Sequence, residues 1–184
     1  QRQEYNASIS GGSDKTRYYV SLNYLDEKSY IKASDFSRIS GRVNLEHEVN
    51  DWLTVGVNAN YANTETNYTA DAGTTNSMFA FTQNIAPIYP VYQRNADGSY
   101  ILDNKGNRML DYGTGNGKAR PYSMNSNPFL DILYNVHEYE YDVINLRGFA
   151  DIKLPIKGLT FHVDGAMDNI ASYSTEFQTP IVGD

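Results

Sequence analysis

The chain has 184 residues, of which 40% are hydrophobic and 20% charged, with 16 Tyr, no Cys and a formal net charge of −7. The absence of Cys excludes disulfides, thiolate metal sites and cysteine nucleophiles, and the acidic balance argues against general nucleic-acid binding. A mean hydropathy of −0.55 and the lack of any run of about 18 apolar residues exclude a transmembrane helix. A transmembrane β-barrel stays open, because barrel strands alternate polar and apolar residues. Since the chain begins without Met or a signal-peptide pattern, we expect a processed chain or a piece of a longer protein.

Alternation of apolar and polar residues at a period of two dominates the chain and predicts about six β-strands. In the fourth expected strand, for example, Val55 and Val57 belong to one face, while Asn58 and Asn60 belong to the other. Several strands reach about ten residues, which exceeds the usual five or six of globular sheets and suits a tilted crossing of a bilayer. In chain order, the strands are expected at residues 5–11, 16–25, 36–47, 52–62, 143–153 and 159–168.

The connections between these strands alternate between short and long. Short turns at residues 11–14, 49–51 and 155–158 carry Gly, Asn, Asp or Pro, whereas the links at residues 26–35 and 63–130 are long. Outer-membrane barrels have short periplasmic turns and long extracellular loops, so this alternation favours a barrel. A soluble β-sandwich, whose alternating apolar faces meet in a core, is the alternative.

The link of residues 62–130 is much longer than loops that only connect two strands, so we expect structure or function within it. Residues 75–86 lack Gly and Pro and predict a short helix that stops before Pro87. Residues 87–92 carry two prolines and are expected to be extended. Turn signals at Asp97-Gly98 and at residues 104–106 predict a small hairpin around residues 100–102.

Ten segments, in this order, resemble the barrel of SusC/RagA-like TonB-dependent transporters. The ordered set covers essentially the whole chain and is far more specific than any single motif. The segments are Asn6–Gly12, Thr16–Ser21, Tyr24–Asp26, Asp35–Arg38, Arg42–Leu45, Val49–Leu53, Pro87–Tyr92, Asp97-Gly98, Asn127-Pro128 and Gly158–Thr160.

The resemblance implies a bacterial outer-membrane barrel of about 22 strands with a plug inside. Such a transporter imports oligosaccharides or peptides with energy relayed by TonB, under a SusD-like surface lipoprotein. We therefore expect an all-β fold: residues 1–184 form an antiparallel transmembrane β-barrel segment of a single barrel domain, with one long extracellular loop (62–130) that contains a short helix. The plug and the closing C-terminal strands are expected to lie outside this segment, because about six strands cannot close such a barrel.

Eight polar residues are expected to face the barrel lumen, where they can hydrogen-bond the plug or a passing solute, or be merely tolerated in a wet interior. They are Arg17, Arg38, Arg42, Asn44, Asn58, Asn60, Asn145 and Arg147.

Aromatic residues of the long loop are candidates for contact with the solute or the lid, because flat rings suit both sugar faces and interface anchors. Packing within the loop is the other interpretation. The candidates are Phe79, Phe81, Tyr89, Tyr92, Tyr100, Tyr112 and Tyr122.

We expect no catalytic site, metal or cofactor. The three His residues lack metal-ligand spacing, and the turns at Asp97 and Asp103 miss the calcium-loop pattern. Glu138, Glu140 and Asp142 alternate on one strand face; a glycosidase pair is conceivable there, but a lumen-facing or extracellular acidic row is favoured.

The sequence therefore predicts a wall segment of a transporter rather than an enzyme. Its expected partners are outer-membrane lipid, the remainder of its own barrel and plug, a SusD-like lipoprotein, TonB through the plug region, and an oligosaccharide or peptide substrate, with no nucleic acid. The alternative function is a soluble β-sandwich that serves as a carbohydrate-binding or adhesin module.

Overall fold

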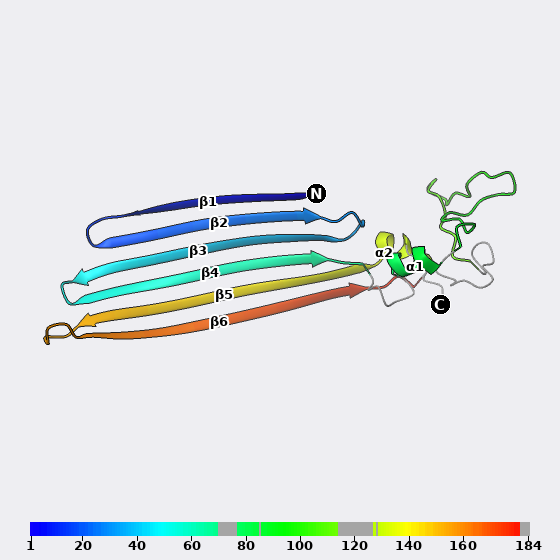
Figure 1. Ribbon diagram of the computed structural model, residues 1–184. Coiled ribbons are helices and arrows are strands. Elements are labelled where there is room, and N and C mark those ends of the chain that lie inside the picture. The colour runs from blue at the N-terminus through cyan, green and yellow to red at the C-terminus, as the bar shows by residue number, and fades with distance from the viewer. Residues whose placement is uncertain (70–76, 85, 114–126, 128, 181–184) are drawn as a thin grey trace. The chain divides into compact units, whose positions relative to one another are not determined.

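The structure, a computed structural model, describes residues 1–69, 77–84, 86–113, 127 and 129–180. Its main feature is one six-stranded sheet in which each strand pairs with the next in sequence, in the order β1-β2-β3-β4-β5-β6 (Figure 1). The strands are β1 (Arg2–Gly12), β2 (Thr16–Lys28), β3 (Asp35–Asn50), β4 (Leu53–Asn67), β5 (Val136–Lys153) and β6 (Thr160–Phe177). The prediction of an all-β segment with about six antiparallel strands is confirmed.

The chain divides into two compact units, which we describe separately. The first holds residues 1–30, 35–66 and 139–174, and therefore most of the sheet. The second holds residues 31–34, 67–138 and 175–184.

The register of the first three strands separates the polar from the apolar side chains. Tyr5 lies opposite Tyr24, and Tyr24 lies opposite Ile39, so these three share one face. One position along, Asn6, Asn23 and Ser40 share the other face. A slip by one residue would exchange the two faces, so the alternation in the sequence specifies this pairing.

The apolar face of the sheet is exposed. Ile9, Leu22 and Met167 keep 61%, 61% and 56% of their surface accessible. The buried hydrophobic side chains among the described residues are Leu25, Phe81 and Leu110. A β-sandwich buries such a face against a second sheet, whereas all six described strands belong to one sheet. The sandwich alternative therefore has no support in the described fold.

Local side-chain chemistry explains the short turns. Between β3 and β4, the Asn50 side-chain oxygen accepts hydrogen bonds from the backbone N–H groups of Trp52 (3.1 Å) and Leu53 (2.9 Å). Between β5 and β6, Gly158 has φ of +82°, a conformation that other residues rarely adopt. Connections of 13–15, 51–52 and 154–159 alternate with those of 29–34 and 68–135, as the sequence predicts.

β5 and β6 are longer than predicted at the end of the sheet from which the long connections leave. β5 begins at Val136 rather than residue 143, and β6 ends at Phe177 rather than residue 168. In these parts of β5 and β6, polar and aromatic residues occupy both faces, so the sequence no longer alternates between polar and apolar residues. The strands continue because backbone groups of neighbouring strands still form hydrogen bonds with them. The loop between β4 and β5 accordingly runs from 68 to 135 instead of 62 to 130.

The second unit contains two short helices, α1 (Met78–Asn84) and α2 (Phe129–Tyr134). α1 lies within the predicted 75–86 helix. The sequence analysis missed α2, whose first N–H group, from Phe129, is capped by the Asn127 side-chain oxygen at 3.1 Å. Among the described residues, neither helix has the length and apolar character to cross a membrane.

Residues 91–111 form a small arrangement that we call the β-triangle, because three segments each pair with the other two. The Gln93 N–H donates to the Met109 carbonyl, the Met109 N–H to the Ile101 carbonyl, and the Ile101 N–H to the Gln93 carbonyl, at 2.9, 3.0 and 3.1 Å. Gly98 and Gly106, with φ of +87° and +83°, form its two turns. The predicted hairpin around residues 100–102 is thus part of a larger unit.

Candidate functional site

One face of the sheet collects the polar side chains that the sequence analysis singled out. The register of β2 and β3 places three of them on this face. Arg17 lies opposite Glu46, Asn44 lies opposite Tyr19, and Arg42 lies opposite Ser21. The Arg42 Nε donates to the Asn60 side-chain oxygen at 2.8 Å, so β4 contributes to the same face. All eight predicted residues lie in the six-stranded sheet: Arg17, Arg38, Arg42, Asn44, Asn58, Asn60, Asn145 and Arg147. That this polar face lines a barrel lumen remains a prediction.

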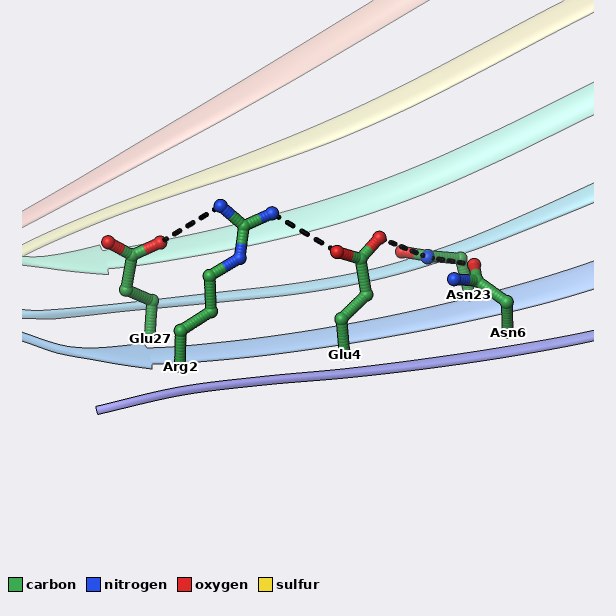
Figure 2. Close-up of polar contacts among 5 residues, drawn as sticks. All are labelled: Arg2, Glu4, Asn6, Asn23 and Glu27. Atoms are coloured by element: carbon green, nitrogen blue, oxygen red, sulfur yellow. Dashed lines mark hydrogen bonds and ion pairs between the residues drawn. The ribbon is translucent and has the colours of Figure 1, made fainter.

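Near the start of β1, the polar face is held by a chain of charge-assisted contacts (Figure 2). Arg2 bridges two carboxylates, Glu4 at 3.1 Å and Glu27 at 3.9 Å. The Asn23 amide then donates to Glu4 at 3.1 Å and to Asn6. Because Arg2, Glu4 and Glu27 are exposed, we assign these ion pairs to positioning the side chains rather than to large stabilisation.

At the other edge of the sheet, β5 and β6 continue the polar face. Asn145 donates to Asp168 at 2.7 Å, and Arg147 pairs with Asp164 at 3.2 Å. His162 contacts Asp151 at 2.6 Å. The sequence analysis gave His162 no specific partner, because this pairing depends on the alignment of two strands across a turn.

A hollow with a volume of about 670 Å³ lies on the polar face between β1 and β5. Its polar lining includes Arg38 and Arg42 together with Asn23, Ser40 and Asn60. Asp and Glu are absent from the residues that line it.

The acidic row lies on the other face of the sheet. The Asp142 carboxylate accepts a hydrogen bond from the Tyr61 hydroxyl at 2.7 Å. The Asn63 amide donates to Glu140 at 2.8 Å and to Asp142 at 3.0 Å. Tyr61 alternates with Asn60 along β4, so these carboxylates lie opposite the Asn60 face. This row therefore lies on the face opposite the predicted lumen residues, so a lumen-facing row and a lumen lined by the Asn60 face exclude each other, and the extracellular arrangement stays a prediction.

Within the second unit, several predicted aromatic residues pack against other side chains. The Tyr100 ring lies between the guanidinium groups of Arg94 and Arg108, which are 4.3 and 4.1 Å from its centroid. Tyr92 meets Tyr100 edge-on at 6.0 Å and Phe129 at 6.5 Å. These are favourable cation–π and aromatic geometries, so both rings help to hold the β-triangle together.

The remaining aromatic candidates differ in exposure. On α1, Phe81 is buried, whereas Phe79 is exposed. Burial raises the pKa of the Tyr112 hydroxyl above its ordinary value. Tyr89 lines a second hollow of about 790 Å³, whose other walls include Pro87 and Gln93. Tyr122 lies outside the described residues, and contact of any of these rings with a solute or a lid remains a prediction.

Two turns of the β-triangle are stabilised by carboxylates that act as hydrogen-bond acceptors. Hydrogen bonds from Ser99 hold the pKa of the Asp97 carboxyl below its usual value, and those from the backbone and side chain of Asn107 do the same for Asp103. Across the described part of the chain, no three His, Asp or Glu side chains are grouped so that they could hold a metal ion.

Comparison with protein-family profiles finds no match. Two curated proteins are each 34% identical to part of the chain. The TonB-dependent receptor P26 of Formosa agariphila matches over 100 residues, which are 52% of this chain and 9% of the relative. The TonB-dependent receptor SusC of Bacteroides thetaiotaomicron matches over 90 residues, 48% of this chain and 9% of the relative.

Two solved structures match almost the whole chain. The RagAB peptide importer in its closed-closed state matches with a TM-score of 0.62 and 26% identity over 96% of this chain and 18% of that one. A structure of the RagAB peptide transporter gives a TM-score of 0.56 at the same identity, over 94% of this chain and 18% of that one. The chain thus spans a small part of the length of its relatives. These similarities confirm the resemblance inferred from the sequence.

Proposed function

We propose that this segment, which is similar to SusC-like TonB-dependent receptors, forms part of the wall of an outer-membrane transporter. The observation that carries the proposal is the division of one sheet into an exposed apolar face and a hydrogen-bonded polar face. A transmembrane barrel requires this division, because alternate residues contact lipid and lumen. The agreement with a peptide importer over 96% of the chain supports the same arrangement.

The apolar face suits lipid better than water. Exposed side chains of its central strands include Leu22, Ile39, Val43 and Ile144, each at least 42% accessible. A contiguous apolar patch of this kind is unusual on a monomeric soluble protein and marks a membrane or protein interface. The outer edges of β1 and β6 carry backbone N–H and C=O groups that need hydrogen-bond partners within a membrane. In the proposed barrel, strands outside this segment pair with these edges and close the sheet.

We further propose that the whole protein imports oligosaccharides or peptides, with energy relayed through TonB and with a SusD-like lipoprotein at the outer surface. The relative's name, TonB-dependent receptor SusC, supports the relay of energy through TonB, and two structures titled as a peptide importer and a peptide transporter support import of peptides. The segment itself supplies wall and loop rather than catalytic machinery, since its relatives are named as receptors and importers.

The localisation is tested by fractionating cells that express the full-length protein. We expect it in the outer membrane, extracted only by detergent. A detergent-free, monodisperse soluble monomer would contradict the membrane assignment.

The transport activity is tested by growth on single nutrients. Cells that lack the protein should fail to grow on one class, oligopeptides or oligosaccharides, and deletion of TonB should reproduce that failure. Normal growth on both classes would refute import while leaving the localisation intact.

A further inference from the structure

Two tyrosines that the sequence analysis did not single out form a ring pair on the polar face of the sheet. Tyr139 and Tyr141, which we call the tyrosine pair, belong to β5, and their ring centroids are 4.5 Å apart with an interplanar angle of 59°. Because they alternate with Glu140 and Asp142, they share the face of Asn145. Tyr141 keeps 40% of its surface accessible, so its ring is open to a solute.

The opposite face of β5 shows where the apolar band of the sheet ends. Leu146 and Ile144 are exposed apolar side chains, whereas Asp142 and Glu140 follow them toward the long connection. A charged side chain on the lipid face of a barrel is destabilising, so these two carboxylates mark the limit of that band. The tyrosine pair, at the same level of β5, therefore lies beyond the band, at the end of the sheet from which the long connections leave.

The strands on either side of β5 contribute small hydroxyl side chains to the same face. β4 and β6 flank β5 in the sheet (Figure 1). Four of their residues lie on the polar face, because an even number of positions separates them from Asn60 or Asp168, which bond Arg42 and Asn145 there. All four carry a hydroxyl group and no charge: Thr64, Thr66, Ser172 and Ser174.

Contacts between the strands place these hydroxyl residues level with the tyrosine pair. On β4, Asn63 donates to both carboxylates that flank Tyr141 in the sequence, so the next residues of β4 lie beside the pair. On β6, Ser172 lies across from Tyr141. Each is four residues from its own strand's member of the Asn145–Asp168 hydrogen bond, and antiparallel strands keep equal steps in register.

We propose that the tyrosine pair is a stacking platform for an uncharged sugar ring, and that the imported solute is a neutral oligosaccharide. This inference rests on the proposed function and names its substrate class. Tyrosine rings present apolar faces to the C–H groups of a sugar, and the surrounding hydroxyl groups both donate and accept hydrogen bonds, as sugar hydroxyls do. An oligopeptide has two charged termini, which would lose hydration beside these side chains without gaining a charged partner.

Saturation-transfer NMR on the full-length, detergent-solubilised protein tests the proposal. The probes are three neutral sugars, maltohexaose, xylohexaose and mannohexaose, with hexagalacturonate as the charged sugar and an oligoalanine as the peptide. We expect at least one neutral sugar to receive saturation from the aromatic protons of the protein, and the charged sugar and the peptide to receive none.

Substitutions assign the binding to the two rings. Tyr139→Ala combined with Tyr141→Ala should weaken binding of that sugar by roughly tenfold, because both stacking faces are lost. Tyr139→Phe combined with Tyr141→Phe should retain most of the affinity, because the faces remain. Tyr173→Ala, which removes an exposed ring from the opposite face of β6, is the matched control and should leave the affinity unchanged. Tyr141→Ala alone should give a smaller loss, and it keeps the test decisive if the double alanine variant does not assemble.

The outcomes separate this inference from the proposed function. Unchanged sugar affinity in the alanine variants would overturn the inference and leave the rings with a packing role. Failure of every neutral sugar to bind, or binding of the oligoalanine alone, would overturn it as well. The proposed function would still stand if the full-length protein is in the outer membrane and cells that lack it fail to grow on one nutrient class.

Discussion

Tyrosine serves different purposes at different positions in this chain. Tyr5 and Tyr24 pair across two strands on the exposed apolar face, whereas Tyr100 lies between two guanidinium groups in the β-triangle. The difference follows from what surrounds each ring, because an amphipathic side chain suits both a membrane interface and a polar loop. The role of each tyrosine in this chain therefore depends on its contacts rather than on its residue type.

Tyr89 and Tyr92 should respond differently to truncation. Tyr92→Ala removes contacts with Tyr100 and Phe129, so we expect a less stable loop that is cleaved faster by protease in intact cells. Tyr89 lines the second hollow, so Tyr89→Ala should lower solute uptake or retention of the lipoprotein at unchanged outer-membrane abundance. Uptake and co-purification with the lipoprotein are measured for both variants, and normal values for Tyr89→Ala would assign that ring to packing alone.

Asp103 should stabilise its turn down to unusually low pH. Its carboxylate accepts hydrogen bonds from the backbone N–H groups of Asn107 and Lys105, both at 2.8 Å, and from the Asn107 side chain at 3.1 Å. These bonds, chiefly the two from Asn107, hold its pKa below the ordinary 3.8. A lowered pKa contributes stability that is fully present above the unfolded value and is lost as the pH falls through the folded value. Hydrogen-exchange protection of these two amides, corrected for intrinsic rates, should therefore persist at pH 5 to 8 and fall only below 3.8.

The Asp103→Asn variant provides the control for this experiment. It should show weaker protection that no longer changes in the acidic range, because the amide does not titrate. Loss of protection in the unmodified protein already above pH 5 would contradict the proposed role of the carboxylate.

At the scale of the elements, each strand separates two environments with a period of two residues. The paired register of β2 and β3 sets Val20 against Val43 on one face and Tyr19 against Asn44 on the other. Adjacent positions should therefore tolerate charge very differently, since one side chain meets lipid and the next meets a wet interior.

Arginine substitutions at neighbouring positions test this division. Val43→Arg and Val57→Arg should each destabilise the membrane-inserted protein by about 2–4 kcal/mol near the bilayer midplane. Asn44→Arg and Asn58→Arg should be much milder. The free energy of unfolding from lipid vesicles and the abundance in the outer membrane measure the effect, and equal damage from both pairs would indicate that both faces pack against protein.

At the scale of the whole molecule, the connections define a topology. The three short connections and the two long ones alternate along the chain, so each kind leaves from its own end of the antiparallel sheet. In an outer-membrane barrel, the short turns face the periplasm and the long loops face the outside.

Cysteine labelling on intact cells tests this topology. The variants Ser29→Cys and Asn104→Cys, in long connections, should react with a membrane-impermeant thiol reagent, whereas Ser13→Cys, Asn50→Cys and Lys157→Cys should not. Since the described protein has no Cys of its own, background labelling of this segment is absent. Permeabilised cells provide the positive control for the second group, and the reverse pattern would invert the orientation.

The amino-acid sequence by itself determined the strands, their faces and the alternation of connections, because each depends on local pattern. Period-two alternation separates the faces within one strand, and Gly, Asn, Asp and Pro mark the turns. The short helix before Pro87 was predictable for the same reason. α2 was not, since its six residues are too few to display a helical period.

Only the tertiary structure decided which distant side chains meet. Tyr61 and Asp142 are 81 residues apart, and their hydrogen bond depends on how β4 and β5 align after a long loop whose length does not fix the register. The hollow beside Arg38 and Arg42 likewise requires several strands side by side. Pattern along the chain sets which face a residue occupies, but the pairing of strands sets its neighbours, and contacts at the candidate site depend on those neighbours.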